Sequence, residues 1–195
     1  MSGSQSRSMD RRQAMGALAL PAIALAIPRL QRGRAITQRG MVGGGVIQAE
    51  AGEARFSVFA SRLTSDDGSE VVLGSVHWHD DGAGVAFRST EIIQYEVLPS
   101  PAEGGELRRV TGIMKDAGAA EYPFALNLLD AGGPGAMRDS VALVVGDGAL
   151  DASGTPAAGL GFTYAVAGTV LGDLQDIAFV IDGENVSMEN ATPTP

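Results

Sequence analysis

The stretch ARFSVFASRLTSDDGSEVVLGSVHWHDDGAGVAFRS, residues 54–89, predicts the fold of this chain. Apolar Phe56 and Val58 alternate with polar Arg55 and Ser57, which is typical of a β-strand that buries one face. The segments SDDGSE and DDGAG interrupt the apolar pattern and are rich in the residues that favour tight turns. The stretch therefore predicts three antiparallel strands joined by hairpins.

The same pattern of short apolar segments and turn residues continues to the end of the chain. No window between residues 41 and 190 shows a helical period, and we expect about nine or ten strands in all. The later strands are expected at residues 91–98, 106–114, 122–130, 139–146, 161–170 and 176–183. The predicted fold is all-β, either an antiparallel β-sandwich or a closed β-barrel of about 8–10 strands, in one domain over residues 41–187.

Charge and composition exclude several classes of protein. The chain has 195 residues, 45% of them hydrophobic, and a net charge of −9, which suits one folded, acidic domain. Of the 23 acidic residues only Asp10 precedes residue 40, whereas half of the 14 basic residues do. No cationic patch is therefore available for nucleic acid. The lack of cysteine excludes disulfides, thiol catalysis and cysteine-ligated zinc.

The N-terminal region carries the features of an export signal. The pair Arg11 and Arg12 precedes an uncharged apolar run over residues 15–27, which is shorter than the roughly 20 residues that span a bilayer. Ala24 and Ala26 form a small-x-small site for a signal peptidase. Residues 1–26 thus predict a twin-arginine-like signal helix, either cleaved after Ala26 or retained as an anchor.

This signal sets the expected location and the remaining segment boundaries. The protein is expected to be exported, and so secreted, periplasmic or attached to the cell surface. Residues 27–40 contain four arginines and are predicted to be a linker, and residues 188–195 a flexible tail. Membrane contact is expected only through the N-terminal segment.

Both histidines of the chain lie in the segment SVHWHDDG. On a strand, His77 and His79 point to one side and Trp78 to the other. The two imidazoles, together with Asp80 or Asp81, form a candidate zinc site, although a third histidine is lacking. The alternative interpretation is a strand end at which Trp78 packs inward, the histidines face solvent and the aspartates form the turn.

A second candidate metal site contains Asp130 and Asp139. Calcium binds carboxylates and carbonyl oxygens supplied by turns, and a Gly-rich segment joins these two residues. The spacing matches no EF-hand. The alternative interpretation is that both carboxylates accept hydrogen bonds from backbone N–H groups and so close the hairpin. Without a metal, no cofactor is expected.

Several short motifs occur in a fixed order along residues 43–181. They are RFSVFASR, then G-x-V-x-W-x-D, then YPFALNLLDAGGPGAMRDSVALVV. This order resembles a diffuse, largely uncharacterised group of exported bacterial β-sandwich domains, in which Asp130, the turn Gly133-Pro134-Gly135 and Asp139 mark one hairpin. The resemblance implies a location on the surface or outside the cell and specifies no activity.

The sequence favours a non-catalytic protein, because it contains no G-x-S-x-G and no H-E-x-x-H motif. The expected function is an exported envelope or extracellular domain with a binding or structural role, whose partner is an unidentified protein, a glycan or a small apolar ligand. One alternative is a small barrel that acts as a ligand carrier or enzyme with an internal pocket. Another is an accessory subunit of an envelope complex, which a long exposed edge strand would support.

Overall fold

The computed structural model describes residues 36–50, 52–101, 105–132, 138–150, 153–182 and 185–188. All regular structure in these ranges is β, and none of it is helical. The strands are β1 (Ile36–Ala49), β2 (Gly52–Ser65), β3 (Glu70–Asp80), β4 (Val85–Leu98), β5 (Glu106–Asp116), β6 (Glu121–Asp130), β7 (Ser140–Gly146), β8 (Thr163–Asp182) and β9 (Asn185–Met188).

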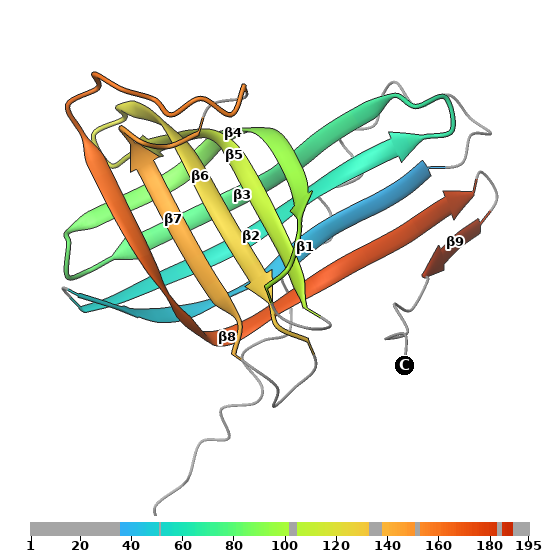
Figure 1. Cartoon of the computed structure of the whole chain (residues 1–195), viewed down its shortest axis with the longest axis horizontal. Helices are drawn as coiled ribbons and strands as arrows, with labels where there is room; N and C mark the ends of the chain where they lie inside the picture. Colours follow the sequence, from blue (N-terminus) through green and yellow to red (C-terminus); the bar gives the residue numbers. More distant parts are fainter. Residues whose placement is uncertain are drawn as a thin grey trace, which may run out of the picture. The chain divides into compact units, whose positions relative to one another are not determined.

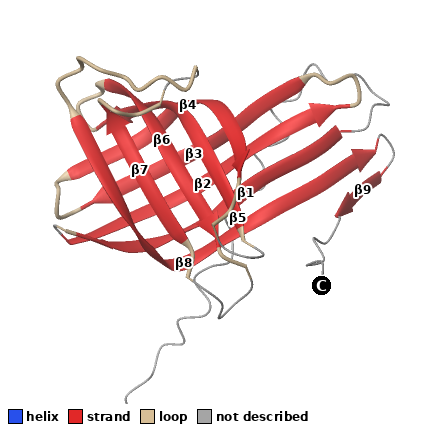
Figure 2. Ribbon diagram, in the orientation of Figure 1, coloured by secondary structure: helices blue, strands red, loops and turns tan. Residues whose placement is uncertain are grey.

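The first eight strands form a closed antiparallel barrel (Figure 1). Each strand pairs with the next one along the chain, and β8 returns to pair with β1 from Ile36↔Ile181 to Ile47↔Val170. Closure of this kind satisfies the edges that an open sheet would leave unpaired. Figure 2 shows that loops join strands at both ends of the barrel. Of the two predicted architectures, the structure is therefore the barrel.

One wall of the barrel continues past the rest. Strands β1, β2, β3 and β8 run on together beyond β5, β6 and β7, toward the right in Figure 1. These strands extend past the others because the barrel wall divides between β3 and β4, which pair only from His77↔Arg88 to Asp80↔Val85. Strand β4 then leaves β3 and pairs with β5 through two register shifts. We call the part of the wall outside the barrel, residues 36–40, 61–65, 70–75 and 176–182, the extension.

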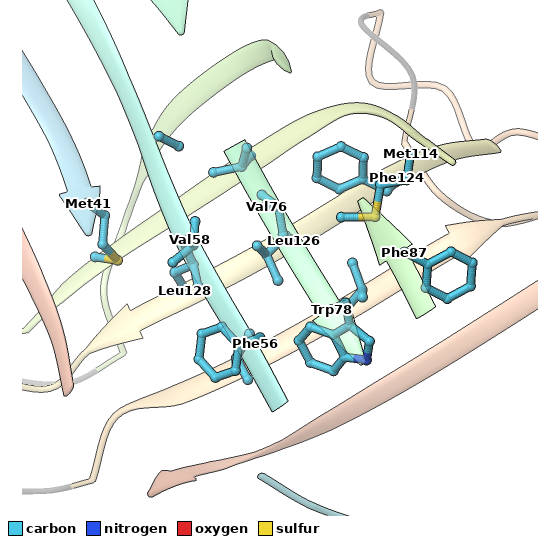
Figure 3. Close-up of a cluster of buried hydrophobic side chains, with 14 of the residues drawn as sticks. Met41, Phe56, Val58, Val76, Trp78, Phe87, Met114, Phe124, Leu126 and Leu128 are labelled. Carbon is cyan, nitrogen blue, oxygen red and sulfur yellow. The ribbon is translucent and has the colours of Figure 1, made fainter. Parts of the chain in front are cut away.

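The barrel interior is packed with apolar side chains from all eight strands (Figure 3). Trp78 from β3 stacks on Phe56 from β2 with ring centroids 5.5 Å apart. Met41, Phe124, Leu126 and the other residues of this cluster are almost fully buried: Ile47, Ala54, Val58, Ala60, Val76, Phe87, Tyr95, Val110, Met114, Leu128, Val141, Leu143, Val145, Val170 and Leu174. Burial of this area is the main favourable contribution to folding.

The glycine run of β1 lies where the barrel closes. A Cβ atom at Gly45 would lie 2.6 Å from the backbone oxygen of Leu171 on β8, and one at Gly44 would lie 2.6 Å from that of Phe56 on β2. The neighbouring strands thus approach β1 too closely for any larger residue. Glycine at these positions is required by backbone proximity.

The predicted strand positions are largely confirmed, with three corrections. Strand β4 is continuous from Val85 to Leu98, where separate strands were expected at residues 84–89 and 91–98. Strand β1 begins at Ile36, so residues 36–40 belong to the barrel wall and not to the predicted linker of residues 27–40. Strand β8 is continuous from Thr163 to Asp182, where two strands were expected, because both of its halves pair with neighbours, first β7 and then β1. The signal helix predicted over residues 1–26, residues 27–35 of the predicted linker and residues 189–195 of the tail lie outside the described residues. Within those described, no helix is long and apolar enough to cross a membrane.

Candidate functional site

In the structure His77 and His79 lie on the outer face of the barrel, and Asp80 points toward its interior. His77 and His79 are exposed, and Trp78 between them is only 2% exposed. Asp80 is on the same side as Trp78 because successive residues of a strand alternate in direction. The interpretation of a strand end is thus confirmed for Trp78, and Asp80 does not join the histidines. His79 Nε2 instead lies 2.7 Å from Asp81 Oδ1.

Asp80 belongs to a series of side-chain hydrogen bonds that extends into the barrel interior. Trp78 Nε1 donates to Tyr164 Oη at 2.9 Å, and Tyr164 Oη donates to Asp80 Oδ2 at 2.7 Å. The other oxygen of Asp80 accepts from the backbone N–H of Ala83 in the following turn. Burial and the hydrogen bond to Asp80 raise the pKa of Tyr164 well above its ordinary value. These hydrogen bonds hold β3 to β8 across the barrel interior.

Asp130 and Asp139, the candidate calcium ligands, accept hydrogen bonds from backbone N–H groups. Asp139 accepts hydrogen bonds from the N–H of Ala131 at 3.1 Å and of Leu174 at 2.9 Å. Asp130 accepts from the N–H of Gly132 at 2.9 Å and of Asp176 at 3.3 Å. All four carboxylate oxygens therefore accept from N–H groups. Two of the donors, Ala131 and Gly132, lie in the predicted hairpin, and the other two lie on β8. No group of three or more histidine or acidic side chains in the described ranges is arranged to hold a metal ion.

A buried arginine joins three strands at the end of the barrel from which the extension projects. Arg108 on β5 is 1% exposed, and its Nε donates to Tyr95 Oη on β4 at 3.0 Å. Its Nη1 donates to Glu106 Oε2 at 2.6 Å, and its Nη2 donates to Asp176 Oδ1 on β8 at 2.8 Å. We call Arg108, Tyr95, Glu106 and Asp176 the Arg108 network.

Burial dominates the electrostatics of the Arg108 network. It raises the pKa of Tyr95 to about 12, although the charge of Arg108 opposes the rise. It also raises the pKa of Asp176 above its ordinary value, because desolvation outweighs the attraction of Arg108. Two further arginines act on these groups from the extension: Arg62 lowers the pKa of Tyr95, and Arg39 lowers that of Asp176.

These two arginines line a groove of about 350 Å³ on the extension. Its lining consists of Thr37 and Arg39 on β1, Arg62, Thr64 and Ser65 on β2, and Asp66 in the following turn. We call these six residues the polar groove. Its volume falls in the usual range for small-ligand sites, and its lining contains no aromatic side chain.

The register of β1 and β2 places the two arginines directly opposite each other. Arg39 pairs with Arg62, and Thr37 pairs with Thr64 on the same face. Like charges at directly opposed positions destabilise a sheet. Glu70 lies 3.7 Å from Arg62 and offsets one of the two charges, whereas Arg39 has no ion-pair partner among the described residues. The groove lining thus contains two arginines and the carboxylate of Asp66, and Glu70 lies beside Arg62.

Sequence reasoning missed both the polar groove and the Arg108 network. Arg39 was placed in a linker, and Arg62 lies on a strand whose partner could not be known. Arg108 and Asp176 are separated by 68 positions and meet only because the barrel closes. The one local signal was the unusual presence of Arg108 within the apolar strand of residues 106–114.

Comparison with known proteins identifies no relative: no protein-family model, no curated protein and no solved structure matches this chain.

Proposed function

We propose that this protein is an exported, non-catalytic β-barrel domain whose polar groove binds a carboxylated saccharide. The observation that carries the proposal is the directly opposed pair Arg39 and Arg62 in the lining of the groove. A single guanidinium group can donate two parallel hydrogen bonds to one carboxylate, and the register places two arginines opposite each other in this lining. A bound carboxylate would also relieve the repulsion between them.

The other lining groups support a glycan over the small apolar ligand considered from the sequence. Thr37, Thr64 and Ser65 supply hydroxyl groups that donate and accept hydrogen bonds to sugar hydroxyls. Neutral sugars usually stack on aromatic rings, and none lines the groove. Arg39, which has no ion-pair partner among the described residues, and the hydroxyl groups together favour an acidic sugar, although the carboxylate of Asp66 opposes its binding. The internal-pocket carrier is less favoured, because the cluster of buried side chains occupies the barrel interior.

The experiment is a thermal-shift titration with trigalacturonate, with neutral maltotriose as the comparison ligand. A ligand at a hundred times its Kd stabilises by about 2.7 kcal/mol, which raises the Tm by several degrees for a domain of this size. We expect Arg39→Gln to abolish the shift. The matched control is Arg55→Gln, because Arg55 is an exposed arginine on β2 that pairs with Asp81 at 3.4 Å and does not line the groove. Equal shifts with maltotriose, or an unchanged shift in Arg39→Gln, would contradict the proposal.

Export is tested separately in cells. Replacement of the arginine pair by Arg11→Lys and Arg12→Lys is expected to retain the protein in the cytoplasm, because twin-arginine export depends on both side chains. Fractionation followed by N-terminal sequencing of the exported form also tests cleavage after Ala26. An exported double variant would show that another route carries the protein.

A further inference from the structure

We propose that the open edge of β3 pairs with the same edge of a second copy of this chain, so that two barrels join their extensions into one continuous sheet. The open edge consists of residues 70–75, which precede the short pairing of β3 with β4. On its other side this segment is paired with β2, from Thr64↔Glu70 to Phe59↔Ser75.

The direction of the backbone groups on this edge follows from one hydrogen bond. The N–H of Val76 donates to Ser89 Oγ at 2.8 Å, so it points toward the β4 side. In an antiparallel strand the groups that point to one edge belong to every second residue. Glu70, Val72 and Gly74 therefore direct their N–H and C=O groups to the open edge. No hydrogen bond from these backbone groups to β4, or to any other part of the described chain, is present on that side.

The open edge lacks the features that usually prevent edge-to-edge pairing. Proteins protect such edges with lysine, proline, bulges or a covering segment. Here the segment is EVVLGS, in which Glu70 is the only charged residue. Val71 is 47% exposed, and Gly74 and Ser75 are exposed as well. The edge thus offers free backbone groups and an accessible apolar side chain at the same place.

The segment is complementary to itself in one antiparallel register. If Val72 faces Val72 of the second copy, Glu70 faces Gly74 and Val71 faces Leu73 of that copy. Three outward-pointing pairs then exchange about six backbone hydrogen bonds. Val71 and Leu73, which share a face of the sheet, meet apolar side chains across the seam. The arrangement is isologous, with a two-fold axis at Val72.

Charge is also placed favourably in this register. Glu70 meets a glycine, which leaves room for its carboxylate, and the two Glu70 residues are four positions apart along the seam, about 14 Å. That separation exceeds the Debye length of about 8 Å at physiological ionic strength, so their mutual repulsion is screened. The net charge of −9 on each chain still opposes association. We therefore expect the dimer to strengthen as salt is added.

Sedimentation velocity of the full chain tests the proposal across a range of concentrations. We expect a reversible shift from the 20.0 kDa monomer to a species of twice that mass. Val72→Pro removes an N–H that points to the open edge and is expected to give monomer at every concentration. Val72→Thr keeps the N–H and the β-branched shape and is expected to dimerise as the original chain does. A chain that stays monomeric throughout, or a Val72→Pro variant that still dimerises, would overturn the proposal.

Two further variants do not depend on the tolerance of β3 for proline. Val71→Glu places a carboxylate at an exposed position opposite Leu73 of the second copy and is expected to give monomer without loss of fold. Because the chain has no cysteine, Val71→Cys provides a single thiol at an exposed position beside the seam, and a short bis-maleimide should join two copies through it. Leu171→Cys, at a position that is 59% exposed on β8, is the matched control. Cross-linking of Leu171→Cys as fast as that of Val71→Cys would refute the seam at β3, and so would an unchanged dimer in Val71→Glu.

Discussion

Replacement of the buried arginine by Arg108→Met is expected to destabilise the protein strongly. Methionine has a similar length and retains the packing of the aliphatic stem, so the change mainly removes the guanidinium group. The lost contacts are those to Tyr95 at 3.0 Å, Asp176 at 2.8 Å and Glu106 at 2.6 Å. These three partners differ widely in solvent exposure, and their exposure determines how much each lost contact lowers the free energy of unfolding.

The carboxylate of Asp176 accounts for most of the expected loss. Its side chain is 14% exposed, whereas that of Glu106 is 48% exposed and can be solvated by water. Removal of one partner from a buried ion pair costs about 3–5 kcal/mol, and loss of an exposed pair costs about 0–1 kcal/mol. We therefore expect the free energy of unfolding of Arg108→Met to be lower by about 3–5 kcal/mol near neutral pH, and its Tm to be lower by about 10 °C.

The assay is urea unfolding monitored through Trp78, the only tryptophan, which is buried in the barrel. The control is Arg109→Met on the same strand. The side chain of Arg109 is 28% exposed, lies 3.8 Å from Glu96 and donates one hydrogen bond to Asn127 at 3.1 Å. We expect the control to lose less than about 1 kcal/mol. Equal losses in the two variants would refute the argument that the Arg108 network stabilises the barrel through buried charge.

The pH dependence of the loss provides a second check. Burial raises the folded-state pKa of Asp176 above its ordinary value of 3.8, and Arg108 opposes that rise. In Arg108→Met the pKa should therefore rise further. A group with a raised pKa stabilises the fold below its unfolded pKa, and that contribution is lost as the pH rises through the folded pKa. The defect of the variant should thus be smallest below pH 3.8 and grow as the pH rises. A defect that is constant with pH would contradict this assignment.

Three other perturbations test the remaining contacts. Tyr164→Phe leaves Trp78 Nε1 and Asp80 Oδ2 without their hydrogen-bond partner, so urea unfolding should show a loss of about 2–4 kcal/mol. Burial raises the pKa of Tyr95 to about 12, so its stabilising contribution is full below pH 10 and is lost between pH 10 and about 12. Alkaline titration at 295 nm should show this late ionisation, and Tyr95→Phe should remove it. Gly45→Ala places a Cβ 2.6 Å from a backbone oxygen of β8 and should lower the stability by about 1–3 kcal/mol, measured as a lower urea midpoint.

Several features of the fold could be predicted because they depend on neighbouring residues. The alternation of Phe56 and Val58 with Arg55 and Ser57 indicated a strand with one buried face, and the structure confirms it. Turn residues between the strands indicated hairpins, and all neighbouring strands of the barrel are antiparallel. Backbone acceptance by Asp130 and Asp139 was also foreseen as an alternative to calcium.

The polar groove, the Arg108 network and the open edge of β3 depend on the tertiary structure alone. Arg39 faces Arg62 because of the register between β1 and β2, and Arg108 meets Asp176 because β8 crosses the barrel end. The open edge exists because β4 leaves β3 after a short pairing. The sequence by itself determined which residues form strands and which face of each strand is apolar. The reason is that apolar and polar residues alternate along a strand, and this pattern depends only on neighbouring positions. Register, closure and strand length were decided by contacts between distant segments, and those contacts bring together every charged group of the candidate site.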